Sequence, residues 1–228
     1  RVKQILETRT RAKVYMTLLD PDQGYRPSSA RRFVHDTDEE LLTTPRYKNG
    51  GDAETQANVS ATLRWCMANA IYKKETAAGV DPRKIVFTSF HCDALYNGKL
   101  RGTMVYIPGA SLRRDYTCSG PTYSRYREVK EGGRYHGTSS ERLRDEALSR
   151  NFASVLLDEL GKRRIRRHLE SDPIRSQIRQ SGGKVYLPAV LRNNLIPTKV
   201  LVEAANLTNR ADCERLSDPN WRQTFAEA

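Results

Sequence analysis

The 228-residue sequence has few cysteines and no cysteine spacing typical of a metal-binding finger. Its four cysteines include no Cys-x-x-Cys pair, and they are too sparse for a small disulfide-bonded scaffold. Spacing alone leaves their pairing open, and it does not identify a redox compartment. Cys66 lies on the apolar face of a predicted helix, where we expect it to pack as a small hydrophobic residue. The others are Cys92, Cys118 and Cys213.

Long hydrophobic runs are also missing. No segment approaches the roughly 18 consecutive apolar residues of a membrane-spanning helix, so no membrane span is predicted. Hydrophobic residues make up 38% of the chain, below the usual globular share, and they are scarce in 20–55 and 111–145. No internal repeat is evident. The sequence therefore predicts one hydrophobic core with long polar insertions.

Acidic residues are outnumbered, 27 against 39 Lys and Arg, which gives a formal charge of +12. This balance favours anionic partners such as nucleic acid, anionic lipid or a cell-wall polymer. The basic residues are dispersed except at 162–168, which reads either as a polyanion-binding patch or as a solvated helix end. No nucleic-acid partner is expected, because the sequence has no DNA- or RNA-binding motif and no basic stripe.

Apolar periodicity predicts alternating strands and helices. We expect helices over 1–9, 54–77, 141–161 and 211–216 and at the end of the chain, with Ser139 or Ser140 capping the third. Strands are expected over 14–18, 84–90, 102–107, 184–192 and 198–204, and loops over 20–53 and 109–140. This order predicts an α/β fold, with one open, twisted, mainly parallel sheet and helices on both faces. Both ends of the chain fall inside helical patterns, so we expect a fragment cut at both ends.

Two of the expected strands end in a residue that can do chemistry. His91 and Glu203 each follow an apolar run, and the carboxyl ends of strands are where ligands bind in open α/β sheets. A carboxylate such as Glu203 is costly after a buried strand unless it is paired or functional. Asp93 can share the side of His91 and orient it if the chain stays extended. Together these residues suggest a metal site with a general acid/base.

Four motifs in order resemble the zinc-dependent N-acetylmuramoyl-L-alanine amidases of the amidase type 3 family. Residues 89–94, Ser-Phe-His-Cys-Asp-Ala, are similar to the family's Ser-Ile-His-Ala-Asn-Ala, and 102–106 match its Gly-Thr-x-x-Tyr strand. Arg-x-x-x-Ala-Asn occurs at 64–69. Pro-x-x-x-Leu-Val-Glu at 197–203, running on to Thr208 and Asn209, is similar to the family's late motif.

The resemblance implies hydrolysis of the amide between N-acetylmuramic acid and L-alanine in peptidoglycan, in the cell envelope, periplasmic or extracellular. It implies that His91 is a zinc ligand and that Glu203 carries a proton from zinc-bound water to the leaving amine. The family's other two ligands precede the position of Arg1. We therefore expect 1–228 to be one amidase-like catalytic domain that lacks its first strand and part of its first helix. Alone, it should bind zinc poorly and have little activity.

The alternative interpretation is a non-catalytic basic module that binds cell-wall polymer or another polyanion. His35, His136 and His168 lie in polar stretches and are expected at the surface. The enlarged loop at about 20–53 is a place where a regulator can bind. Four tyrosines are candidates for stacking on sugar or peptide, and Tyr106 among them is expected in the core; the others are Tyr116, Tyr123 and Tyr126.

Overall fold

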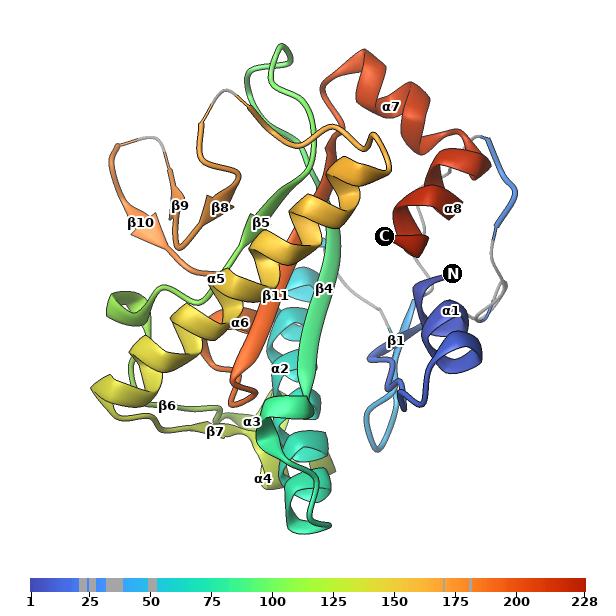
Figure 1. Cartoon of the computed structure of the whole chain (residues 1–228). Helices are drawn as coiled ribbons and strands as arrows, with labels where there is room; N and C mark the ends of the chain where they lie inside the picture. The colour runs from blue at the N-terminus through green and yellow to red at the C-terminus, as the bar shows by residue number, and fades with distance from the viewer. Residues whose placement is uncertain (21–23, 25–27, 32–38, 49–52, 170, 181) are drawn as a thin grey trace.

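A four-stranded sheet forms the centre of the computed structural model, which describes residues 1–20, 24, 28–31, 39–48, 53–169, 171–180 and 182–228. The strand order is β4 (Val86–Asp93), β11 (Thr198–Asn206), β5 (Met104–Tyr106) and β8 (Ile174–Arg175). β4 runs parallel to β11 and β5 parallel to β8, while β11 and β5 are antiparallel. The predicted α/β class with a mainly parallel sheet is confirmed (Figure 1).

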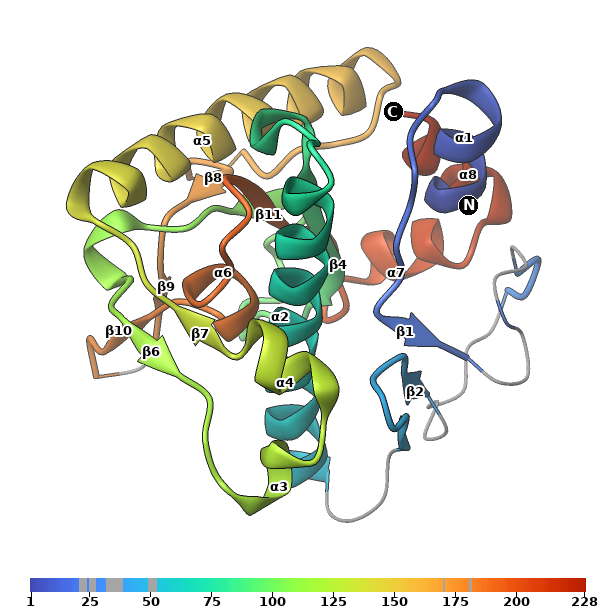
Figure 2. The same ribbon diagram turned by 90° about the horizontal axis from the view of Figure 1, so that it is seen from below.

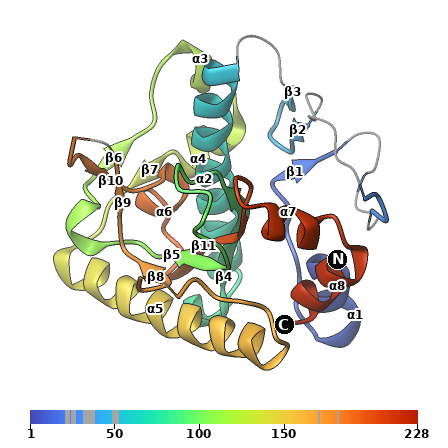
Figure 3. The same ribbon diagram turned by 90° about the horizontal axis from the view of Figure 1, so that it is seen from above.

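One face of the sheet is covered by α5 (Ser139–Lys162), as Figures 2 and 3 show from opposite sides. Val200 and Val202 of β11 pack there against apolar residues of α5: Ala153, Leu157 and Leu160. Thr138, rather than Ser139 or Ser140, is the N-cap, and it forms a capping box with Glu141.

The opposite face packs on a second layer of helices. Leu201 of β11 joins Met104 and Tyr106 of β5 in a cluster with Val190 and Leu191 of α6 (Ala189–Arg192). Behind α6 lies the long α2 (Ala53–Ala77), which also packs against α4 (Arg127–Gly132). Helices therefore cover both faces, and alternate residues of β11 serve the two layers.

Smaller elements surround this sandwich. α1 (Val2–Arg9), α7 (Arg210–Leu216) and α8 (Pro219–Glu227) lie beyond the β4 side of the sheet (Figure 1). Phe90 of β4 contacts Phe225 of α8, with ring centroids 6.4 Å apart. No helix in the described part of the chain is long and apolar enough to cross a membrane.

The structure corrects several predicted elements. The described part of 20–53 is not all loop, because β1 (Leu18–Leu19), β2 (Glu40–Leu41) and β3 (Tyr47–Lys48) form a small antiparallel sheet. The strand expected at 14–18 begins only at Leu18. The stretch expected to be loop over 109–140 contains short elements: η2 (Ala110–Leu112), β6 (Tyr116–Thr117), α3 (Pro121–Ser124), α4 and β7 (Arg134–Tyr135).

The strand predicted over 184–192 is also wrong. Only β10 (Val185–Tyr186) is extended, paired with β9 (Ile178–Arg179), and α6 follows it. Pro188 is the N-cap of α6, where its missing N–H costs nothing because the first turn of a helix leaves its N–H groups unpaired. In α5, the apolar residue Val155 is 54% exposed, so it lies outside the buried stripe of the helix. The 3₁₀ turn η1 (Pro82–Lys84) leads into β4.

Candidate functional site

The structure brings His91 and Glu203 together on neighbouring strands. In the parallel ladder of β4 and β11, His91 lies directly opposite Glu203, and Ser89 lies opposite Leu201. Residues opposite one another in a ladder project to the same face. Because Leu201 packs in the cluster with α6, His91 and Glu203 face the layer of α2 and α6. Both strands continue past this pair, so it lies on a sheet face before the strands end.

Glu203 is a buried carboxyl with an unsatisfied oxygen. Glu203 is only 9% exposed, and its Oε2 has no hydrogen-bond partner among the residues that the structure describes. Burial, and to a lesser extent the charge of Asp93, raise the pKa of Glu203 to about 7. A carboxyl with this pKa exchanges its proton at neutral pH, which is the property needed of a general acid/base.

The pKa of His91 is shifted downward, in the direction opposite to that of Glu203. Burial, and then the positive charge of Arg64 on α2, lower the pKa of His91. Its Nε2 lies 3.0 Å from the Ser89 hydroxyl on the same strand. The imidazole is therefore kept neutral at neutral pH, with a ring nitrogen lone pair available as a donor to a metal or a proton.

Asp93 does not orient His91. Its Oδ1 accepts the N–H of Ala94 at 2.8 Å, and its backbone carbonyl accepts the N–H of Leu207. Ser89 takes the partner role that the sequence suggested for Asp93. Asp93 acts on the site through its charge, which adds to the pKa shift of Glu203.

A zinc centre requires more than these residues supply. Catalytic zinc is held by three protein ligands plus water. Within the described ranges, no group of three or more His, Cys, Asp or Glu residues is placed to hold a metal ion. His91 and Glu203 thus fit a part of such a centre but do not complete one.

The other histidines divide into three cases. His136 lies at the surface as expected, with Nδ1 2.5 Å from Asp115. His35 lies outside the described residues. The prediction that His168 lies at the surface is wrong, because His168 is only 1% exposed. Its backbone N–H donates to the Thr103 carbonyl, and its Nε2 lies 3.1 Å from the Ser171 hydroxyl.

The basic stretch at 162–168 explains this correction. α5 ends at Lys162, and the chain reverses at Arg164, whose φ is 60°. It then joins the sheet through a bridge between Arg167 and Thr103, which buries Ile165 and His168. Only part of the stretch is a solvated helix end.

The tyrosines are likewise split between core and surface. Tyr106 is 4% exposed, as expected of a core residue, and Tyr126 is also buried. Tyr116 is 46% exposed and packs edge-on against Trp65, with centroids 5.9 Å apart. Tyr123 packs at the margin of the cluster around α2 and α4.

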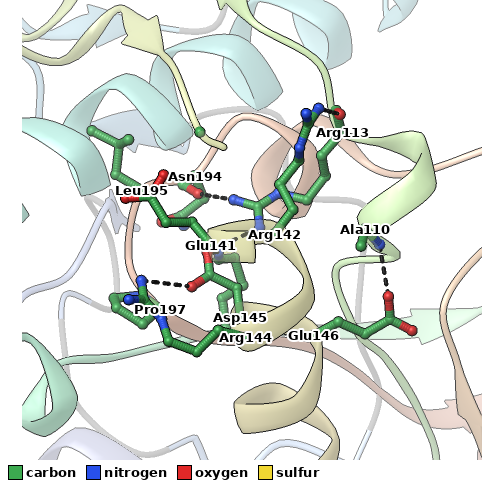
Figure 4. A network of polar contacts seen from close by, with 12 residues as sticks. Ala110, Arg113, Glu141, Arg142, Arg144, Asp145, Glu146, Asn194, Leu195 and Pro197 are labelled. Carbon is green, nitrogen blue, oxygen red and sulfur yellow. Dashed lines mark hydrogen bonds and ion pairs between the residues drawn. The ribbon is translucent and has the colours of Figure 1, made fainter. Parts of the chain in front are cut away.

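The sequence analysis missed a buried ionic network at the other end of β11. The Asp145 carboxylate of α5 accepts hydrogen bonds from Lys199 Nζ and Arg113 Nη1, each at 2.9 Å. Arg113 also donates to the Asn194 carbonyl at 2.9 Å, and Arg144 lies 3.5 Å from the second Asp145 oxygen. Figure 4 shows the part of this network around Arg113 and Asp145. Lys199 itself was a local signal of this network, because a lysine within an apolar strand needs a buried partner for its charge.

Comparison with known proteins identifies a family for the whole chain. A family model described as N-acetylmuramoyl-L-alanine amidase matches residues 1–228. No curated protein sequence matches the chain.

Several solved structures are similar to the model. The CwlD amidase from Clostridioides difficile, solved in complex with the GerS lipoprotein, has 15% identity and a TM-score of 0.45, covering 78% of this chain. The chain spans 61% of that CwlD chain. The amidase Ami1 from Mycobacterium smegmatis has 14% identity and a TM-score of 0.42, with 88% of this chain and 89% of Ami1 covered.

Proposed function

The chain belongs to the N-acetylmuramoyl-L-alanine amidase family of hydrolases, and we propose that the intact protein hydrolyses the amide between N-acetylmuramic acid and L-alanine in peptidoglycan. We propose that 1–228 is one catalytic domain and that it acts in the cell envelope, periplasmic or extracellular. The polymer is anionic, and the formal charge of +12 favours such a substrate.

The observation that carries this proposal is the buried Glu203 carboxyl, which has one oxygen unpaired among the described residues and lies opposite the neutral imidazole of His91 in the ladder. In the proposed reaction, ionised Glu203 accepts a proton from the attacking water. The water oxygen bonds to the amide carbon, the C–N bond breaks, and the proton passes to the leaving alanine nitrogen. With a pKa of about 7, Glu203 is suited to both transfers.

Zinc is the second part of the proposal. The family resemblance assigns a zinc ligand role to His91, and its neutral, desolvated imidazole supports that role. Zinc, when bound, supplies a polarised carbonyl and a more acidic water. Because His91 and Glu203 do not complete a centre, we expect this chain alone to retain less than one equivalent of zinc after dialysis, measured by atomic emission. Stoichiometric retention that survives His91→Ala would contradict the assigned role.

The activity test is release of new N-terminal alanine from purified peptidoglycan by the intact protein. Glu203→Gln should lower the rate by roughly 10²–10⁴-fold, the usual contribution of a general acid/base. Glu214→Gln is the matched control, because Glu214 is an exposed glutamate on α7 paired only with Arg210. An unchanged rate in Glu203→Gln would remove Glu203 from the mechanism.

The rival, a non-catalytic basic module, is not favoured by the family match. Salt-sensitive wall binding that is indifferent to both His91 and Glu203, without alanine release, would restore it. A regulator bound at 20–53 remains a proposal. Deleting 21–38 in the intact protein should then abolish any activation by the cell's own envelope fraction and leave the basal rate unchanged.

A further inference from the structure

The molecule holds two cysteine thiols in one buried cluster that contains neither His91 nor Glu203. Cys66 of α2 is fully buried, and Cys118, which follows β6, is 7% exposed. Both belong to the apolar cluster formed by α2, α4 and the β2–β3 segment. The two thiols interact with each other directly, which lowers the pKa of Cys118 and raises that of Cys66.

Three contacts hold the two backbones close together. The Cys118 N–H donates to the Gly133 carbonyl at 2.7 Å. Gly132, its neighbour, lies so close to α2 that an added Cβ would overlap the Cys66 carbonyl oxygen. Only this glycine pair therefore separates α2 at Cys66 from the chain at Cys118. The third contact is the edge-on packing of Trp65, which precedes Cys66, against Tyr116, which lies two residues before Cys118.

Figure 2 shows the same arrangement at the level of elements. α4 lies along α2, and the β6–β7 ribbon enters from the side of α4. α2 and α4 make one of the most extensive element contacts of the described chain, and Asn69 of α2 also bonds the Gly132 carbonyl at 3.0 Å. The two thiols are thus carried by closely packed elements of the fold.

We propose that Cys66 and Cys118 form an intrachain disulfide when the protein meets a disulfide oxidant such as oxidised glutathione. Cys118, the more exposed thiol, attacks the oxidant as a thiolate, breaks its S–S bond and releases one glutathione thiol. Cys66 then displaces the second glutathione, forming the Cys66–Cys118 bond. Two protein thiols are oxidised, one external disulfide is reduced, and the two protons end on the glutathione thiols.

The bond would tie the long helix α2 to the β6 segment across a 66–118 loop. Such a cross-link stabilises mainly by restricting the unfolded chain. Cys92 and Cys213 serve as internal controls, because each is only partly buried and neither belongs to the apolar cluster of Cys66 and Cys118.

The test refolds the reduced chain in a buffer of reduced and oxidised glutathione and maps its cysteines by non-reducing digestion and mass spectrometry. We expect a peptide pair joining Cys66 to Cys118, lighter by two hydrogens than the sum of its thiol forms. The double variant Cys92→Ser with Cys213→Ser should keep this pair. Dithiothreitol should lower the melting temperature of both proteins by roughly 5–10 °C.

Cys118→Ser should abolish the cross-link and the effect of dithiothreitol while keeping the far-ultraviolet circular dichroism of the reduced wild type. The disulfide mapping needs only the wild-type protein. It therefore decides whether Cys66 and Cys118 are joined even if the Cys118→Ser variant fails to fold. Cys66 and Cys118 that both remain alkylatable after refolding, or a different pairing such as Cys66 with Cys92, would overturn the proposal.

Discussion

Lys199 and Glu203 lie on the same face of β11 and are both buried, yet the fold treats them differently. Burial brings the pKa of each to about 7, downward for Lys199 and upward for Glu203. Lys199 has a carboxylate partner in Asp145, which also binds Arg113. In the described part of the chain, one oxygen of Glu203 has no hydrogen-bond partner. The comparison teaches that burial alone does not mark a reactive group. A missing partner does, because the group then has nothing to hold its charge.

The first prediction removes the shared partner at the Lys199 end. Asp145→Asn leaves two buried cations without a counter-charge and should lower the free energy of unfolding by about 3–5 kcal/mol, measured by urea denaturation. Asp158→Asn is the control: Asp158 lies on the same helix, is 62% exposed, and should change stability by less than about 0.5 kcal/mol. Equal losses in the two variants would mean that the network does not stabilise the fold.

The second prediction concerns Glu203, where removing the buried charge should raise stability at high pH instead of lowering it. The folded-state pKa of about 7 lies above the ordinary value of 4.5, so between these pH values the folded protein holds a proton that the unfolded chain has lost. Glu203 therefore contributes stability below pH 4.5 that disappears as the pH rises through 7. Glu203→Gln should be more stable than wild type at pH 8, by on the order of 2 kcal/mol, relative to their difference at pH 4.5.

Thermal or urea unfolding at several pH values measures this difference. Glu214→Gln should show no such pH-dependent gain, because Glu214 is 64% exposed. A Glu203→Gln variant whose difference from wild type stays constant from pH 4.5 to pH 8 would show that Glu203 is not strained by its burial.

The third and smallest prediction concerns the neighbour of Glu203. Burial and the charge of Arg64 lower the pKa of His91, so Arg64→Gln should raise it, as followed by nuclear magnetic resonance of the imidazole nitrogens. Arg83→Gln is the control, because Arg83 is 82% exposed and paired with Asp81. If both variants leave the titration of His91 in place, Arg64 does not act on the imidazole.

The sequence predicts the strands that carry His91 and Glu203 better than it predicts the ionic network around Lys199. Apolar runs before His91 and Glu203 are local signals, and they correctly indicate two strands of one sheet. Only β11 is buried, however, because β4 is an edge strand whose Val86 and Phe90 are 43% and 46% exposed. That the two residues lie opposite each other depends on register, which is set by the packing of whole strands. The Lys199 network joins positions 113, 145 and 199 from three separate segments, and no local pattern predicts which of them meet.

The misplacement of His168 has the same origin. A stretch dense in arginine reads as solvated, but after the turn at Arg164 the chain joins the sheet and buries Ile165 and His168. Similarly, the sequence gives no sign that 189–192 is helical, since a single helical turn carries too few residues for a periodic pattern. Asp93, suggested as the partner of His91, instead accepts the N–H of Ala94 on its Oδ1.

The central claim is that Glu203 is a carboxyl poised to exchange a proton at neutral pH, and its titration tests this directly. Carbon-13 resonances of glutamate carboxyls in the labelled chain, recorded from pH 3 to pH 9, would give the pKa, with Glu203→Gln identifying the signal. The account predicts a pKa of about 7 for Glu203. A value near 4.5 would show that Glu203 is solvated or paired, and would contradict its role as the proton carrier.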